Sequence, residues 1–277
     1  MNVANGLKKA AQVPLRVLDQ LGDQGWLYLR TLGWAPRTLS RYKKEVLRIL
    51  TEVTFGSGGL AVIGGTVIIV GLLTSFTGSV VGLQTYTALN QLGAAAFTAF
   101  IAAYFNTREI SPLVAAIGLT ATVGAGFTAQ LGSMRISEEI DALEVMAIPS
   151  LPFLVTTRVI AGFVAITPLY AAGLLTSYLA SRLTVAVFYG QSLGTYDHYF
   201  ILFLPPVDIL YSFLKVLVTA VLIILIHCYY GYRTTGGPAG VGVAVGRSVR
   251  ASLVLIFVLD IAVSLALWGS TTTVKIS

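Results

Sequence analysis

Ionisable side chains stand inside long apolar stretches of this sequence, where charges are costly and often functional. Asp208 and Lys215 lie seven residues apart in one stretch, and Asp260 lies in the middle of the last one. Arg108 and Glu109 end another stretch. Seven residues are about two helical turns, so Asp208 and Lys215 would share a helix face without touching. Such residues form either a polar site for a solute within the membrane or a set of structural charges that partner residues stabilise.

Residues for other kinds of chemistry are missing or scattered. The sequence contains no G-x-x-x-x-G-K-[ST] run, so this chain is not expected to bind ATP through a P-loop. His198 and His227 lie far apart, and no group of Cys, His and Asp shows metal-ligand spacing. There is also no nucleophile elbow, which disfavours an enzyme that acts on lipid. We therefore expect no catalytic residue, metal or cofactor in the chain itself.

Segment 134–149 carries its charges in a different pattern. Ser137 is a suitable N-cap, and acidic residues in the next turn would suit the helix dipole. One face would be apolar and another acidic, with Ile136, Ile140, Leu143 and Ala147 opposed to Glu138, Asp141 and Glu144. The pattern predicts a short amphipathic helix along the cytoplasmic membrane surface. It is either a docking helix for a soluble partner or an ordinary solvated loop helix.

The elements that must position these residues are membrane-spanning helices. Hydrophobic residues make up 56% of the chain and charged residues only 11%, about half the usual charged share of a soluble domain. A bilayer core requires about 20 apolar residues per helix. The apolar stretches are 57–83, 88–105, 112–132, 153–181, 201–230 and 251–269. We therefore predict an all-α integral membrane protein.

The first 50 residues are basic and amphipathic rather than apolar. Nine of the 18 Lys and Arg residues lie in 1–48, and apolar side chains recur there at helical spacing. Trp26 and Trp34 add aromatic side chains that favour a membrane interface. We interpret 1–50 as an N-terminal interfacial helix, with a loosely ordered basic tail as the alternative. Attraction to anionic lipid explains this charge better than binding to nucleic acid.

The basic segments predict the topology, because they tend to stay on the cytoplasmic side. We place the N-terminus, segment 135–152 and a basic loop at 231–250 on that side. Three apolar stretches separate the first two segments, although an even number of crossings is required. We therefore expect the shortest stretch, 88–105, to be re-entrant. The prediction is one membrane domain over 51–277 with five transmembrane helices, a cytoplasmic N-terminus and an external C-terminus.

Several motifs resemble the MlaE/YrbE permease family, in the same order along the chain. The run 108–116 (REISPLVAA) resembles the family signature R-E-x-x-P-x-V-A-A. Segment 134–152 resembles the family's coupling segment, E-x-x-x-A-L-x-V-M-A-[IV]. Other features in family order are Gly82-Leu83-Gln84, Asp208 to Lys215, Gly231-Tyr232 with the glycine-rich basic segment after it, and Asp260. The resemblance covers essentially the whole chain.

This resemblance implies a function, a fold and a set of partners. MlaE/YrbE proteins are the transmembrane subunits of ABC transporters that move lipids in the Mla and Mce systems of the inner (plasma) membrane. They have an N-terminal interfacial helix, five spanning helices and a cytoplasmic coupling helix. Two permeases pair, and a separate ATPase dimer binds ATP and docks on the coupling helix. MCE-domain proteins on the outer face pass lipid to a pocket between the permeases.

The resemblance also assigns roles to individual residues. The lipid pocket would involve Val81, Tyr86, Leu89, Arg108, Glu109 and Ile110. The contacts to the ATPase would involve Glu138, Glu139, Asp141, Leu143 and Met146. The apolar mouth would suit a fatty acid, mycolate, sterol or phospholipid, and the Mce resemblance favours import.

Two positions depart from the family's pattern. Many members carry a Gly-Arg-x-Gly run in the span after the signature, followed by a Glu. Here the aligned residues are Thr122 and Gln130, whereas Gly124 is retained. The missing charges favour one half of a heterodimer, as in actinobacterial Mce systems that contain two YrbE paralogues.

Two other classes of function remain open from the residues alone. A secondary carrier or channel for a small solute would use the intramembrane residues Asp208, Lys215 and Asp260. A scaffold would only anchor partners and would hold no lipid between paired permeases. Transport driven by an ion gradient without an ATPase would distinguish the carrier from the lipid permease.

Overall fold

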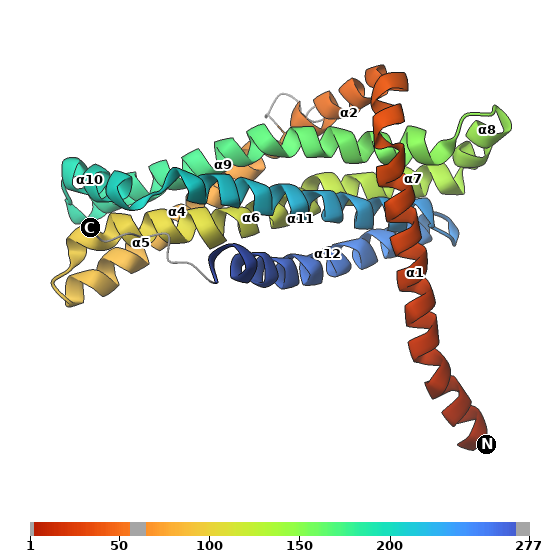
Figure 1. Cartoon of the computed structure of the whole chain (residues 1–277), viewed down its shortest axis with the longest axis horizontal. Coiled ribbons are helices and arrows are strands. Elements are labelled where there is room, and N and C mark those ends of the chain that lie inside the picture. The colour runs from red at the N-terminus through yellow and green to blue at the C-terminus, as the bar shows by residue number, and fades with distance from the viewer. Residues whose placement is uncertain (1–2, 56–64, 270–277) are drawn as a thin grey trace.

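The computed structural model describes residues 3–55 and 65–269, and every regular element in those ranges is helical. Among the described residues, five helical segments are long and apolar enough to cross a membrane: Gly65–Gln91, Ala95–Ile136, Leu151–Tyr189, Pro206–Tyr232 and Gly237–Trp268. They lie alongside one another as a bundle (Figure 1). The prediction of an all-α membrane protein with five spanning helices is confirmed.

Short elements join and interrupt these long helices. We call the two ends of the bundle the α8 end and the α10 end, after the elements that lie there (Figure 1). In chain order the elements are α1 (Val3–Arg41), α2 (Lys43–Phe55), α4 (Gly65–Gln91), η1 (Ala95–Phe97), α5 (Thr98–Phe105), η2 (Asn106–Ile110), α6 (Ser111–Leu119), η3 (Thr120–Gly124), α7 (Ala125–Ile136), α8 (Glu139–Val145), η4 (Leu151–Thr156), α9 (Thr157–Tyr189), α10 (Leu193–Phe203), α11 (Pro206–Tyr232) and α12 (Gly237–Trp268).

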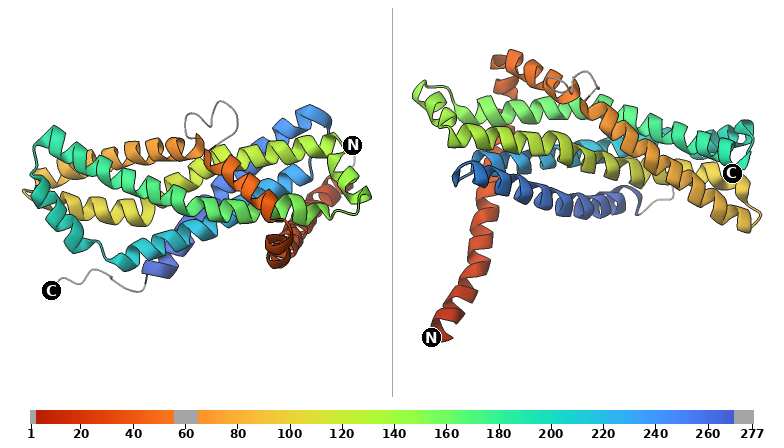
Figure 2. Two further views of the ribbon diagram at one scale, coloured as in Figure 1. Left: turned by 90° about the horizontal axis from the view of Figure 1, so that it is seen from above. Right: turned by 180° about the vertical axis from the view of Figure 1, so that it is seen from behind.

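The N-terminal segment forms two helices, α1 and α2, which are separated at Tyr42. α1 runs across the bundle near the α8 end, and its first part projects past α12 (Figures 1 and 2). Leu27, Thr31 and Thr38 are buried, whereas Trp26 is 68% exposed. A helix that lies transverse to the spans and exposes a tryptophan side chain has the arrangement expected at a membrane interface.

The re-entrant segment expected over 88–105 is not present, so this part of the prediction is wrong. α4 continues to Gln91, and a short turn with Gly93 at φ +69° then reverses the chain. Ala95–Ile136 forms one continuous helical span of 42 residues. At 1.5 Å per residue this is about 60 Å of helix, roughly twice the thickness of a bilayer core. The stretches 88–105 and 112–132 therefore share one crossing, which keeps the number of crossings even.

Polar residues between those two stretches do not break the helix, and several of them bond within it or to neighbouring helices. η2 is a wide, π-helical turn in which Asn106, Thr107 and Arg108 are buried. The Asn106 side-chain amide donates a hydrogen bond of 2.9 Å to the Ser181 hydroxyl of α9. A second π-helical turn, η3, follows between α6 and α7. Such turns occur frequently at functional sites. Arg108, which lies in η2, is therefore a candidate functional residue.

The basic segment 231–250 is helical rather than a loop, which corrects a second expectation. A turn from Arg233 to Gly236 separates α11 from α12, and Gly236 and Gly237 have positive φ values of +89° and +69°. Arg247 and Arg250 therefore lie on the first half of α12. The many glycines suggested a loop, but glycine is frequent within membrane helices, whose backbone groups must bond internally.

Small residues allow α4 and α9 to approach each other closely. Gly78 and Gly82 form a G-x-x-x-G pattern on α4, and they lie against Ser177 and Ser181 of α9. The Ser181 hydroxyl donates a hydrogen bond of 2.6 Å to the backbone oxygen of Gly78. Close packing of this kind holds helices together in a bilayer, where the hydrophobic effect between helices is absent.

Candidate functional site

A buried ion pair links the long span to α11 in the half of the bundle nearer the α10 end. Arg108 lies in η2, and its Nη2 and Nε donate to Asp208 Oδ2 at 2.6 and 2.9 Å. Trp268 Nε1 donates to Asp208 Oδ1 at 3.0 Å, and Arg108 Nη1 donates to the Tyr104 hydroxyl at 2.6 Å. The Arg108 and Asp208 side chains are only 4% and 3% exposed. This pair is therefore almost completely shielded from solvent.

A second group of charges surrounds Lys215 beside that pair. Lys215 Nζ lies 2.6 Å from Asp260 Oδ1 and 3.0 Å from Glu109 Oε2. It also donates to the Ser264 hydroxyl at 2.7 Å and to the backbone oxygen of Arg108 at 2.9 Å. Ser264 in turn donates to Glu109 Oε1 at 2.8 Å. Lys215 thus connects η2, α11 and α12 through one ammonium group.

Two polar stripes at helical spacing bring these residues together. On α11, Asp208 and Lys215 share the predicted polar face without contacting each other, because each pairs with a residue of another helix. On α12, Asp260, Ser264 and Trp268 are spaced four residues apart, so their side chains lie on one face of the helix. The stripes are Asp208, Ser212, Lys215 and Thr219 on α11, and Asp260, Ser264 and Trp268 on α12. The α12 stripe is the sequence signal that would have found Ser264 and Trp268.

The ionic cluster formed by these five charged residues has one more acidic than basic group. Arg108 and Lys215 face Asp208, Glu109 and Asp260, so the fully ionised cluster carries a charge of −1. Inside a bilayer such charges persist only when partners and hydrogen bonds compensate them. Glu109 is the most exposed of the five side chains at 34%. It is therefore the member of the cluster that a polar ligand reaches most easily.

The remaining residues assigned to a lipid pocket lie on α4 and in η2. Val81, Tyr86 and Leu89 are half-buried on the last turns of α4, and Ile110 is half-buried at the end of η2. Tyr86 stacks on Tyr189 of α9 with ring centroids 4.1 Å apart. α4 also contacts η2, so the apolar residues and the ionic cluster belong to the same half of the bundle.

At the opposite end, α8 is a seven-residue helix between α7 and the span that begins at Leu151. Ile140 is fully buried, and Leu143 packs half-buried against the core. Val145 and Met146 are 88% and 62% exposed. The helix is therefore fixed at its base and presents an apolar tip.

Acidic residues surround this tip, although the start of α8 differs from the expectation. Glu138, Glu139 and Asp141 are exposed, and Asp141 pairs with Arg135 at 2.6 Å. Ser137 is not the N-cap; Glu138 occupies that position with φ +62°. The Ser137 hydroxyl donates instead to Glu139 Oε1 at 2.9 Å. The left-handed residue divides the expected helix over 134–149 into the end of α7 and the separate α8.

Comparison with known proteins identifies the family. The family model described as Permease MlaE matches residues 57–266. The chain belongs to the MlaE permease family. A probable ABC transporter permease protein of Rickettsia bellii is 30% identical over 190 residues, which cover 69% of this chain and 73% of that protein.

Relatives of this MlaE permease also occur outside the genus Rickettsia. The Arabidopsis thaliana protein TRIGALACTOSYLDIACYLGLYCEROL 1, chloroplastic, is 33% identical over 194 residues, which cover 70% of this chain and 55% of that protein. A probable ABC transporter permease protein of Synechocystis is 28% identical over 203 residues, which cover 73% of this chain and 77% of that protein. This membership disfavours the ion-driven carrier as an explanation of the buried charges.

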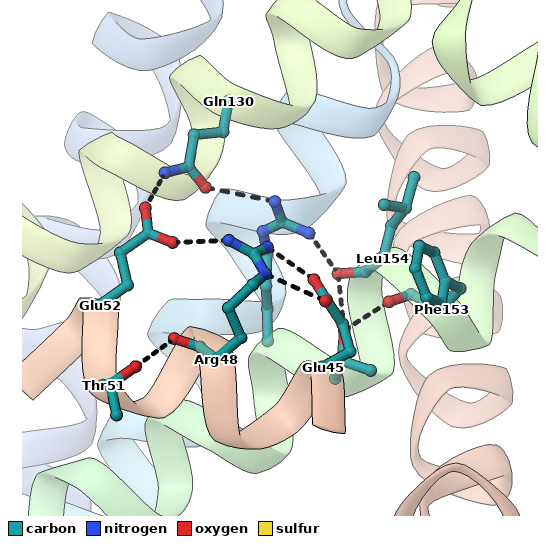
Figure 3. Close-up of polar contacts among 9 residues, drawn as sticks. Glu45, Arg48, Thr51, Glu52, Gln130, Phe153 and Leu154 are labelled. Atoms are coloured by element: carbon teal, nitrogen blue, oxygen red, sulfur yellow. Dashed lines mark hydrogen bonds and ion pairs between the residues drawn. The ribbon is translucent and has the colours of Figure 1, made fainter. Parts of the chain in front are cut away.

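A second polar network of the MlaE permease joins α2 to the bundle (Figure 3). Arg48 lies 2.6 Å from Glu45 and 3.2 Å from Glu52 on the same helix. Gln130 of α7 donates to Glu52 at 2.7 Å and accepts from Arg158 Nη2 of α9 at 3.2 Å. Arg158 is only 4% exposed. Gln130, one of the two positions that depart from the family's pattern, therefore links α2 to a buried cation.

The other departure from the pattern lies within the long span. Thr122 is part of η3, and its hydroxyl donates to the backbone oxygen of Gly118 at 2.7 Å. Gly124 lies directly against the His227 ring of α11, where a larger residue would overlap it. Thr122 therefore satisfies its own polar group locally, whereas Gly124 allows close contact between η3 and α11.

Proposed function

We propose that this chain is the transmembrane permease subunit of an MCE-associated ABC transporter that moves lipids. A separate ATPase would bind ATP and power the movement. The proposal is supported by the relatives from Rickettsia and Synechocystis, which are described as probable ABC transporter permeases. The name of the Arabidopsis relative refers to trigalactosyldiacylglycerol, a lipid. The substrate class would be a fatty acid, mycolate, sterol or phospholipid, and the direction would be import.

The exposed tip of α8 is the observation that carries this proposal. A cytoplasmic ATPase dimer would receive Val145 and Met146 in a groove, with Glu138, Glu139 and Asp141 at the rim. Exposed apolar side chains within an acidic surface are typical of a protein interface rather than of a solvated loop. The α8 end would then face the cytoplasm of the inner membrane, with the C-terminus outside.

Movement of α8 would reach the ionic cluster through a single helical span. The span Ala95–Ile136 contains Arg108 and Glu109 of the cluster and ends three residues before α8 begins. Its two π-helical turns, η2 and η3, are the positions where the helix can change its winding most easily. ATP hydrolysis in the partner would therefore shift η2, which carries Arg108 and Glu109, relative to α11 and α12.

Lipid would bind at the α10 half, between this chain and a second permease. Val81, Tyr86, Leu89 and Ile110 would contact the apolar part of the lipid. Glu109 would meet the polar head, since it is partly exposed, whereas Arg108 is held by Asp208. A second YrbE-type permease in a heterodimer is favoured by Thr122 and Gln130, and MCE-domain proteins would attach at the α10 end.

The test changes the tip of α8 without changing its buried base. The double variant Val145→Asp, Met146→Asp should weaken ATPase binding about 30-fold, the scale of an interface hot spot of about 2 kcal/mol. Leu92→Asp is the matched control, because Leu92 is 79% exposed in the turn at the other end of the bundle. Co-purification of the ATPase and its hydrolysis rate in proteoliposomes report the effect. Unchanged binding and hydrolysis in the double variant would overturn the docking role of α8.

A further inference from the structure

A polar cleft of about 760 Å³ lies where α1 crosses the turn between α11 and α12. Gln24 of α1 forms one wall, and Tyr229 and Arg233 at the end of α11 form another. The first turns of α12 close the cleft with Val243 and Arg247. It lies at the α8 end, so it is separate from the ionic cluster in the α10 half (Figure 1).

Two arginines give this cleft a positive charge. Arg233 and Arg247 both line it and both are exposed. Arg247 forms no ion pair or hydrogen bond with any residue in the part of the chain that the structure describes. Arg233 Nη1 contacts Asp23 Oδ2 at 2.7 Å, but both side chains are about half exposed, at 49% and 55%. A solvent-exposed pair of this kind is weak, so an anion can replace Asp23 as the partner of Arg233.

The surroundings of the cleft combine this charge with features of a membrane interface. Val243 of α12, which lines the cleft, is 51% exposed. Arginines beside exposed apolar side chains suit a ligand with a phosphate and acyl chains. Basic pockets between transmembrane helices bind the head groups of anionic lipids, and arginine binds phosphate through several parallel hydrogen bonds.

We propose that this cleft binds the phosphate of an anionic phospholipid between Arg233 and Arg247, at a site separate from the transport route. The lipid would connect α1 to the start of α12, with its acyl chains beside the exposed apolar side chain of Val243. A chain that transported no lipid would still bind lipid here. Failure of this proposal and failure of the proposed function are therefore distinguishable.

The test counts bound lipid on the full chain by native mass spectrometry after exchange into micelles that contain phosphatidylglycerol or phosphatidylcholine. Arg233→Gln and Arg247→Gln should each lower phosphatidylglycerol binding about fivefold, because one basic group near anionic lipid contributes about 1 kcal/mol. Arg250→Gln is the matched control, since Arg250 is exposed on the same helix but does not line the cleft. Phosphatidylcholine binding should not change in any of the variants.

Asp23→Asn provides a test in the opposite direction. It removes the carboxylate that competes for Arg233, so phosphatidylglycerol binding should rise. Equal losses in the Arg233, Arg247 and Arg250 variants, or no loss in any of them, would overturn the proposal. Displacement of the lipid by millimolar inorganic phosphate would assign the cleft to a soluble phosphate compound instead. If the Arg233 and Arg247 variants lost ATPase binding but kept their lipid binding, the cleft would instead be a contact site for the ATPase.

Discussion

At the scale of single residues, every charge of the ionic cluster has its partner on another helix. The sequence predicted that Asp208, Lys215 and Asp260 lie within the membrane and that the first two share a face. It did not predict their partners, because Arg108 and Asp208 are 100 positions apart in sequence. Helical spacing shows which residues share a face of one helix, whereas packing between helices decides which faces meet.

The ion pair between Arg108 and Asp208 predicts a strong coupling in stability. Arg108→Ala and Asp208→Ala should each lower the free energy of unfolding by about 3–5 kcal/mol, because each leaves a buried charge without its main partner. The double variant should lose clearly less than the sum of the two. Denaturant unfolding in detergent measures all three variants. Arg250→Ala is the control and should change stability by less than about 0.5 kcal/mol. Strictly additive losses would contradict this pairing.

At the scale of elements, sequence predicted the helices better than their ends. The length and composition of the apolar stretches indicated six segments, and only the requirement for an even number of crossings reduced them to five spans. Segmentation by apolarity had divided one long helix at residues 106–111. Nothing in local composition shows that Ser181 of another helix accepts a hydrogen bond from Asn106 there. The network that connects α2 to Gln130 and Arg158 was missed for a similar reason. Only the spacing of Glu45, Arg48 and Glu52 within α2 was visible in the sequence.

The packing of α4 on α9 depends on the absence of a side chain at Gly78. Gly78→Ala should lower the free energy of unfolding by about 1–3 kcal/mol, since its Cβ would overlap backbone atoms of Ser177. Gly126→Ala is the matched control, because a Cβ on Gly126 of α7 meets no atom within 4 Å. That substitution should be neutral or slightly stabilising. Thermal unfolding of both variants measures the difference, and equal effects would contradict the close contact between α4 and α9.

The network of α2 predicts a pH dependence of stability. The hydrogen bond from Arg48 lowers the pKa of Glu45 below its ordinary value of 4.5. A lowered folded-state pKa stabilises the fold above the unfolded pKa, and this contribution disappears as the pH falls through the folded value. The difference in Tm between the wild type and Glu45→Gln should therefore be largest near pH 7 and shrink below about pH 4.5. A difference that stays constant down to pH 3 would argue against this ion pair.

At the scale of the whole molecule, the two candidate sites lie at opposite ends of one bundle. The family match covers both, from the start of α4 to the last turns of α12. The resemblance of 108–116 and 134–152 to family motifs was sufficient to place them in the sequence. The structure adds that a single 42-residue span connects them. In the proposed function, contacts at α8 would act on Glu109 through this span.

Purification of the chain from its native membranes in mild detergent, followed by mass spectrometry of proteins and lipids, tests the central claim most directly. The proposed function predicts recovery of an ATPase, a second permease, MCE-domain proteins and a bound lipid. The identity of that lipid would define the substrate class. Recovery of this chain alone, without an ATPase under conditions that preserve known membrane complexes, would contradict its assignment as a subunit of an ATP-driven lipid transporter.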